Sequence, residues 1–165
     1  MGIQGIRTYM KACVFSDSHG FSGNMMKAVN IEKPDAVFFL GDGERDIAEL
    51  EVKFPDLEIW AVRGNCDFVS KLSSADCRVF EGVTVFATHG HLSDVKYDPR
   101  LEILTSQAAE AGADIALFGH THRQHMSESR GVTLINPGEC GRGWYPGYAV
   151  LNLDDGRFSA ELKTI

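Results

Sequence analysis

The sequence has little that would bind polyanions, cross-link the chain or anchor it in a membrane. Acidic residues outnumber basic ones by 23 to 16, giving a net charge of −7, so the basic face of a general nucleic-acid-binding protein is not expected. The four cysteines form no C-x-x-C pair, as expected for reduced thiols in a cytoplasmic protein. The N-terminus has no signal-peptide pattern, and no apolar run is long enough for a membrane span.

The length of 165 residues predicts one domain with a core of its own. Residues 1–10 read as a short irregular lead-in, and residues 11–165 as the single domain. We find no internal repeat, low-complexity tract or linker. Small α/β enzymes often form symmetric oligomers, so a homo-oligomer is a possible assembly.

The first third of the chain alternates strands and helices, which implies parallel strands joined by helical crossovers. The predicted strands are 11–15, 36–40 and 58–62, and the predicted helices are 22–30 and 45–53.

The remainder is mostly β-structure, with turn residues between paired apolar runs. The predicted hairpins are 77–80 with 83–88, 124–129 with 132–135, and 148–153 with 158–162. A helix is predicted over 99–111 and a short strand over 115–118. Together these elements indicate two packed sheets with helices on the outside.

Polar clusters follow five of the predicted strands. They are D-S-H at 17–19, G-D at 41–42, G-N at 64–65, H-G-H at 89–91 and G-H-T-H at 119–122. In α/β sheets, ligands bind at the carboxyl ends of parallel strands. Histidine, aspartate and asparagine are ligands of borderline divalent metals. The pattern therefore predicts a metal site at this edge.

Each cluster alone has an ordinary structural explanation. An aspartate commonly caps a helix, an asparagine beside glycine favours a turn, and a histidine can be a core residue. Two side chains in D-x-H at a strand end would share a face because strand side chains alternate. The G-H-T-H cluster is the most specific, since two imidazoles at i and i+2 can address two adjacent metal positions. The coincidence of five clusters favours a shared site.

The ordered set D-S-H, G-D, G-N-C-D, T-H-G-H, G-H-T-H and N-P-G resembles the calcineurin-like metallophosphoesterase superfamily. The chain is most similar to its small single-domain branch of bacterial and archaeal phosphodiesterases, from about Lys11 to the C-terminus. The resemblance implies a four-layer α-β-β-α sandwich of two mixed sheets. It also implies hydrolysis of a small phosphate diester through direct attack by a hydroxide that bridges two metal ions.

The resemblance also assigns the metal ligands. It implies two divalent ions, with manganese the first choice and iron, zinc or nickel as alternatives. Residues for the first ion are Asp17, His19 and His122, those for the second are Asn65, His89 and His120, and Asp42 bridges both. The expected catalytic residues are Asp42, Asn65 and His91.

Two positions depart from the better-known members of the superfamily. Cys66 stands where many members carry a histidine that acts on phosphate or on the leaving group. Its absence removes the obvious general acid and favours diesters with acidic leaving groups. His91 either contacts phosphate in its place, or lines the cleft or pairs with an acid.

The second departure is Glu139, where the small branch commonly has serine after N-P-G. This carboxylate could repel an anionic substrate, bind a cation or point away from the site. Arg142, in a glycine-rich loop, is either a phosphate contact or a solvated arginine. His125 lies outside every motif and is expected to be structural.

Three other functions remain to be weighed. One is a general phosphomonoesterase. Another is a non-catalytic interaction scaffold, like the retromer subunit that shares this fold but has degraded metal ligands. The third, a nuclease acting on polymers, is disfavoured by the acidic charge and the small size.

Overall fold

The computed structural model describes residues 9–165. Within this range the chain forms ten strands, three α-helices and one short 3₁₀ helix. In chain order they are β1 (Tyr9–Phe15), α1 (Gly23–Glu32), β2 (Ala36–Phe39), α2 (Glu44–Lys53), β3 (Glu58–Ala61), β4 (Ala75–Phe80), β5 (Val83–Thr88), η1 (His91–Ser93), α3 (Glu102–Glu110), β6 (Ile115–Leu117), β7 (Gln124–Ser129), β8 (Val132–Pro137), β9 (Gly147–Asp154) and β10 (Arg157–Thr164).

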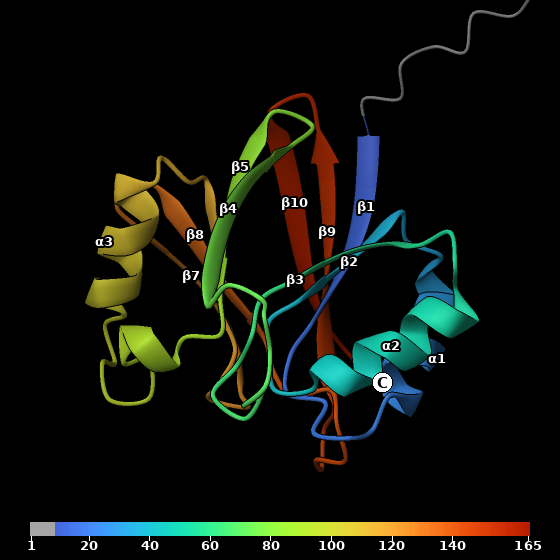
Figure 1. The fold of residues 1–165 in the computed structure, drawn as a ribbon. Coiled ribbons are helices and arrows are strands. Elements are labelled where there is room, and N and C mark those ends of the chain that lie inside the picture. Colours follow the sequence, from blue (N-terminus) through green and yellow to red (C-terminus); the bar gives the residue numbers. More distant parts are fainter. Residues whose placement is uncertain (1–8) are drawn as a thin grey trace, which may run out of the picture.

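The strands form two mixed five-stranded sheets that pack face to face (Figure 1). The first sheet has the order β10-β9-β1-β2-β3, and the second has the order β4-β5-β6-β8-β7. Strands β1, β2 and β3 are parallel, as are β5, β6 and β8. The parallel strands occupy adjacent positions in both sheets, so their carboxyl ends lie at one end of the sandwich.

Three apolar layers hold the four-layer arrangement together. Val14, Phe38 and Leu117 belong to the layer between the sheets. A second layer joins the first sheet to α1 and α2, and a third joins the second sheet to α3. Figure 1 shows α3 on one side of the sandwich and α1 with α2 on the other. The predicted α-β-β-α fold is therefore confirmed.

The continuous apolar sequence of β1 follows from burial on both of its faces. Ala12 and Val14 face the second sheet, whereas Cys13 and Phe15 pack beneath the helices. A strand covered on both faces has no polar alternation. This is why the strand was recognisable from sequence.

Some boundaries differ from the predicted ones. Strand β1 begins at Tyr9, which pairs with Asp154, and the rest of the expected lead-in, residues 1–8, lies outside the described residues. Helix α3 begins at Glu102 rather than at 99, because Leu101 has a left-handed backbone (φ 54°) that a helix cannot contain. Asp98 caps this start by accepting the Ile103 N–H at 3.2 Å. The η1 helix was not predicted.

The helices of residues 9–165 are too short or too polar for any of them to cross a membrane.

Candidate metal centre

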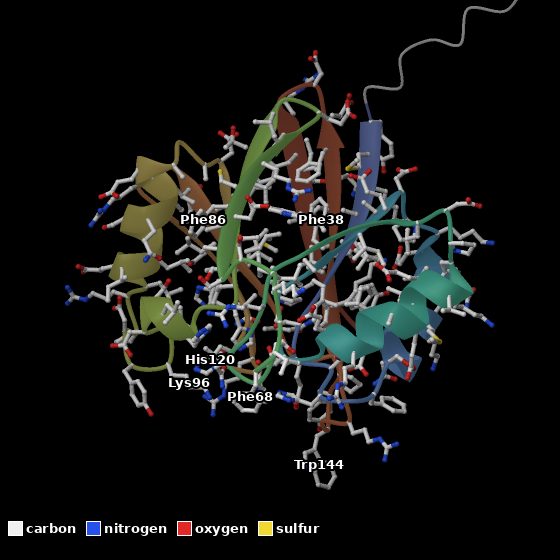
Figure 2. The ribbon with its side chains drawn as sticks, in the orientation of Figure 1. Phe38, Phe68, Phe86, Lys96, His120 and Trp144 are labelled. Carbon is white, nitrogen blue, oxygen red and sulfur yellow. The ribbon has the colours of Figure 1, made fainter. Side chains whose placement is uncertain are left out.

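The loops that follow the parallel strands are joined by backbone hydrogen bonds. Asp17 N–H donates to the Gly41 carbonyl at 2.9 Å, and His19 N–H donates to the Asp42 carbonyl at 3.0 Å. In the second sheet, Gly119 N–H donates to the His89 carbonyl at 3.0 Å. Each strand-end loop is thus fixed against its neighbour. Figure 2 labels His120 and Phe68 at this end of the molecule.

Five of the seven expected ligands have a left-handed backbone. They are Asp17 (φ 58°), His19 (46°), Asp42 (61°), His120 (68°) and His122 (61°). This region is unfavourable for residues with a side chain, and such strain concentrates at functional sites. Asp17 and His19 are therefore brought together by a turn. The expectation that strand alternation would align them is wrong.

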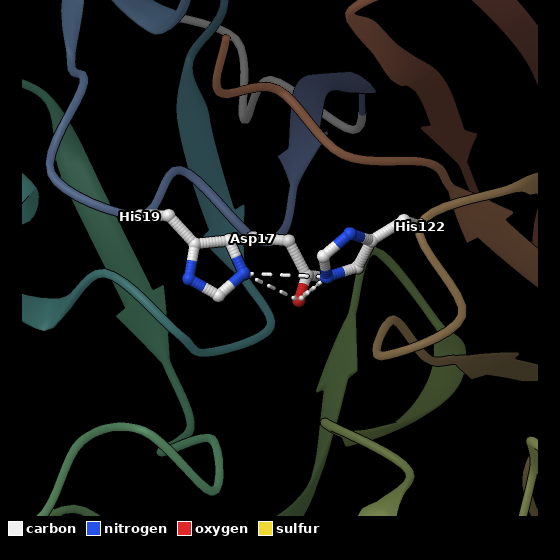
Figure 3. A group of neighbouring side chains, drawn as sticks. All are labelled: Asp17, His19 and His122. Atoms are coloured by element: carbon white, nitrogen blue, oxygen red, sulfur yellow. Dashed lines mark hydrogen bonds and ion pairs between the residues drawn. The ribbon is translucent and has the colours of Figure 1, made fainter. Parts of the chain in front are cut away.

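The first donor group contains Asp17, His19 and His122 (Figure 3). His122 Nε2 lies 3.2 Å from Asp17 Oδ1, and His19 Nε2 lies 3.5 Å from the same oxygen. The two Nε2 atoms are 3.2 Å apart. The group joins the loop after β1 of the first sheet to the loop after β6 of the second.

The second donor group contains Asp42, His89 and His120. His89 Nε2 is 3.2 Å from Asp42 Oδ2, and the rings of His89 and His120 lie 5.0 Å apart. Asp42 Oδ2 is also 3.9 Å from His19 Nε2 of the first group. Asp42 therefore lies between the two groups.

Buried atoms without hydrogen-bond donors indicate that a cation fits here. His89 is fully buried, and its Nδ1 lies 2.7 Å from the Leu40 carbonyl. Because a carbonyl only accepts, Nδ1 carries a proton, so Nε2, which has no hydrogen-bond partner, is the nitrogen left to bind an ion. Asp17 Oδ1 is likewise buried with no hydrogen-bond partner. Unsatisfied acceptors that converge in a buried space match the needs of a divalent ion.

The local electrostatics couple the carboxylates to the imidazoles. Burial opposes the charge of Asp17, but the imidazoles of His122 and His19 lower the pKa of its carboxyl far below the usual range. Burial likewise opposes the charge of Asp42, but the neighbouring His89 ring and the Cys66 N–H lower this pKa as well. The two carboxylates in turn raise the pKa values of His19, His89 and His122. Burial lowers the pKa of His120 to about 4. His120 is then neutral at pH 7, with a lone pair available.

Asp67 organises the loop around Asp42. Its carboxylate accepts the backbone N–H groups of Asp42 at 2.8 Å, Gly64 at 2.7 Å, Gly43 at 3.0 Å and Glu44 at 3.1 Å. It thus caps α2 and ties the loop after β2 to the loop after β3. Sequence reasoning missed this role, although an aspartate that follows a G-N turn was a usable signal.

Asp46 plays a similar part beside His19. It is buried within α2 and accepts hydrogen bonds from Ser18 Oγ and from the Gly20 N–H. These bonds hold the backbone on both sides of His19. Asp46 was read only as a helix residue, because its partners are distant in sequence.

Two glycines of the motifs are required by close approach. A Cβ on Gly64 would lie 2.1 Å from Asp42 Oδ1, and one on Gly119 would lie 2.0 Å from Ser16 Oγ. Any side chain at these positions would displace the donors.

Asn65 and Cys66 lie in an exposed turn beside Asp42. Cys66 N–H donates to Asp42 Oδ1 at 2.7 Å, and Asn65 Nδ2 is 3.5 Å from Cys66 Sγ. Cys66 also forms a third donor group with His19 and Asp42, a possible thiol donor that the sequence interpretation left out. Burial, together with the charge of Asp42, raises the pKa of this thiol.

The remaining candidates fall at different distances from the donors. His91 packs beside the second group, with its ring 5.5 Å from that of His89, and its buried Nδ1 has no hydrogen-bond partner. Arg142 stacks on Phe21, 4.8 Å from the ring centroid. Glu139 reaches His122, with Oε2 3.3 Å from Nδ1. His125 bonds Ser127 Oγ at 2.7 Å, as a structural residue would.

A cleft of about 640 Å³ opens beside the donors. Asp42 and Cys66 line it on the donor side, and Arg45, Phe68 and Val69 line it further out. Phe68 and Val69 are 86% and 87% exposed. The cleft therefore has both apolar and charged walls.

Comparison with known proteins identifies the family. Residues 10–156 match the family model described as the calcineurin-like phosphoesterase superfamily domain. A probable metallophosphoesterase of Bacillus subtilis, YsnB, is 32% identical over 130 residues, which cover 78% of this chain and 74% of that protein. A phosphodiesterase of Methanocaldococcus jannaschii is 28% identical over 152 residues, covering 79% and 84% of the two chains.

Solved structures agree with this assignment. A predicted phosphoesterase from Streptococcus pneumoniae has a TM-score of 0.77 at 30% identity, covering 94% of this chain and 90% of that one. Vps29 from Entamoeba histolytica, solved with Zn²⁺, has a TM-score of 0.76 at 19% identity, covering 94% and 98%, and it supports the fold alone. The match over nearly the whole described chain, together with the two donor groups, leads to one conclusion: this chain belongs to the calcineurin-like phosphoesterase superfamily.

Proposed function

We propose that this protein is a phosphodiesterase that depends on two divalent metal ions. The observation that carries the proposal is the pair of adjoining donor groups with buried acceptors that lack hydrogen-bond donors. The first ion would be held by Asp17, His19 and His122, and the second by Asn65, His89 and His120. Asp42 would contact both.

The charge of the site suits a phosphate ester. Asp17 and Asp42 bring two negative charges, whereas the imidazoles and the Asn65 amide are neutral ligands. A pair of divalent ions supplies Lewis-acid activation of water and neutralises developing charge on the phosphoryl oxygens. With only two anionic ligands, the loaded site keeps a positive charge that attracts an anionic substrate.

Cys66 and the cleft support a diester as substrate. The position next to Asn65 lacks an imidazole, and burial with the Asp42 charge keeps the Cys66 thiol protonated and weakly acidic. A leaving group must then depart with little proton donation, which favours esters of acidic alcohols. The cleft beside Asp42 has room for that group. A relative named as a phosphodiesterase is consistent with this preference.

His91 is our candidate for a phosphate contact. Its ring lies beside His89 and His120, and its Nδ1 has no partner within the protein. Burial lowers the pKa of His91, so it is neutral at pH 7 and can donate one hydrogen bond. A small phosphate ester is the expected partner, and the net charge of −7 disfavours nucleic acid.

Manganese is our first choice of metal, with iron, zinc and nickel as alternatives. Imidazole and carboxylate donors bind all four. The Cys66 thiol near His19 and Asp42 favours zinc over manganese if it is recruited, because thiolates prefer softer ions.

The test combines metal analysis with a substrate panel. Protein reconstituted with Mn²⁺ should bind two ions per chain and should hydrolyse bis(p-nitrophenyl) phosphate, and chelation should abolish the activity. Asp42→Asn should weaken both metal sites and lose most activity. Full activity and full metal content in Asp42→Asn would refute the two-metal proposal, and faster cleavage of glycerol phosphate than of the diester would favour a phosphomonoesterase.

A non-catalytic scaffold is the second candidate, because a Vps29 protein shares the fold. Trp144 and Tyr145, exposed by 95% and 85%, could also contact a protein partner. The full set of donors in this chain argues against a role in binding alone. Metal loading without hydrolysis of any ester in the panel would support the scaffold.

A further inference from the structure

The imidazole of His122 lies between two carboxylates. Its Nε2 faces Asp17 Oδ1 at 3.2 Å, within the first donor group, and its Nδ1 faces Glu139 Oε2 at 3.3 Å. Glu139 follows β8 and belongs to neither donor group of the proposed metal centre. It therefore contacts a ligand from the side away from the metal position.

The chain holds Glu139 in this place from both sides. Gly147 N–H donates to the Glu139 carbonyl at 2.8 Å, and Cys140 N–H donates to the Ser16 carbonyl at 2.9 Å. These bonds attach the backbone of Glu139 to β9 and to the loop that carries Asp17.

The loop also leaves space for the carboxylate itself. A Cβ on Gly143 would lie 1.9 Å from Glu139 Oε1. The side chain of Glu139 therefore occupies volume that exists only because residue 143 is a glycine.

This arrangement matters when an ion is bound. A histidine that holds an ion through Nε2 carries its proton on Nδ1, and the carboxylate of Glu139 lies where it can accept that N–H. A carboxylate behind a ligating histidine also makes the ring a stronger donor. His89 receives the equivalent orientation from the neutral Leu40 carbonyl, so the two donor groups differ in the charge behind their histidines.

We propose that Glu139 is a positioning residue that accepts the Nδ1–H of ion-bound His122 and strengthens divalent-ion binding by the Asp17–His19–His122 group. The inference rests on the proposed metal centre. It also answers the question raised by the N-P-G-E sequence: the carboxylate neither points away nor faces the cleft, but backs a ligand.

The first test measures ion affinity. Metal-free Glu139→Ala should bind one Mn²⁺ roughly 10–100-fold more weakly than the wild type, with the affinity of the other ion unchanged. Glu139→Gln should fall between them, because its amide oxygen still accepts a hydrogen bond but carries no charge. Glu128→Gln, which makes the same change of charge at an exposed position of strand β7, is the matched control for Glu139→Gln.

The second test reads the ring directly in protein loaded with Zn²⁺, which is diamagnetic. Nitrogen-15 NMR should show the Nδ1–H of His122 in a strong hydrogen bond in the wild type and in a weaker one in Glu139→Ala. An unchanged Nδ1–H signal, or unchanged affinities for both ions in a folded Glu139→Ala, would overturn the inference. So would a crystal structure of the Mn²⁺-loaded protein with Glu139 directly bound to an ion.

The two tests separate this inference from the proposed function. Wild-type protein that binds no ion, or only one, would contradict the two-metal centre whatever the role of Glu139. If the wild type binds two ions and Glu139→Ala binds both with unchanged affinity, the proposed function remains supported, and Glu139 has no part in ion binding.

Discussion

His120 and His122 are two residues apart, yet their imidazoles join different donor groups. Their left-handed backbone conformations turn the side chains in different directions, so that His122 meets Asp17 and His120 meets Asp42. We predict that His122→Ala and His120→Ala lose different ions. Anomalous diffraction from Mn²⁺-soaked crystals of each variant measures this, and loss of the same ion in both would contradict the assignment.

Cys66 is the residue from which we predict a change in substrate preference. Its backbone N–H bonds Asp42, and a substitution keeps that bond, while the side chain faces the cleft. We predict that Cys66→His raises kcat/KM on alkyl monoesters relative to aryl diesters, because an imidazole there can protonate a poor leaving group. General acid catalysis is typically worth about 10²–10⁴-fold, and a transplanted group should give less.

The control for this experiment is Cys77→His, the same substitution at an exposed cysteine on β4. The ratio of the two kcat/KM values is compared at equal metal loading. An unchanged ratio in Cys66→His would show that this position does not set the preference, and His91 would be examined next.

At the scale of elements, Glu32 ties α1 to three adjacent strands of the first sheet, β1, β9 and β10. Its carboxylate, at the end of α1, accepts bonds from Lys11 on β1 at 2.7 Å, Lys163 on β10 at 2.7 Å and Tyr148 on β9 at 2.8 Å. Burial opposes its charge, but these bonds lower the pKa of Glu32 to about 2.

Because the folded pKa of Glu32 lies below its ordinary value of 4.5, the charged carboxylate stabilises the fold above that pH. This contribution should be lost as the pH falls from about 4.5 to about 2. We predict that Glu32→Gln lowers the free energy of unfolding by about 2 kcal/mol at pH 7, with a smaller difference near pH 2. Urea denaturation of the wild type and of Glu32→Gln between pH 7 and pH 2 measures this difference in the free energy of unfolding. A difference that does not change with pH would contradict the lowered pKa of Glu32.

The elements differ in how far the sequence could predict them. Strand β2 was recognisable because burial on both faces makes Ala36–Phe39 continuously apolar. The pairing of β9 with β1 was not predictable, because nothing local records a partner about 140 residues away. The start of α3 was predicted too early. Leu101 has a left-handed backbone, which ends the helix on its N-terminal side, and Asp98 caps the helix from outside it.

The same distinction applies to the site. The donors could be predicted because each follows an apolar strand directly in sequence. Asp67, Asp46 and Glu139 could not be assigned, because their partners come from distant loops. Aspartate and glutamate occur in many roles on protein surfaces, and the role of each of these residues becomes clear only when the folded chain shows its partners.

At the scale of the molecule, both donor groups span the sandwich. Asp17 and Asp42 follow strands of the first sheet, whereas His122, His89 and His120 follow strands of the second. Bound ions would therefore cross-link the two sheets at one end. Since only the folded chain assembles these donors, metal binding should stabilise it against unfolding.

We predict that Mn²⁺ raises the melting temperature and that EDTA reverses the rise. At a free ion concentration 100 times the dissociation constant, one site adds about 2.7 kcal/mol. Differential scanning calorimetry measures the shift, and Asp42→Asn should show a much smaller one. An equal shift in Asp42→Asn would mean that the ion binds elsewhere.

The left-handed backbone of five donors, Asp17, His19, Asp42, His120 and His122, has a consequence for mutation. Glycine adopts that conformation without steric cost, so replacing a donor by glycine would remove its side chain while relieving backbone strain. Loss of ion binding in such a variant would therefore not imply loss of the fold.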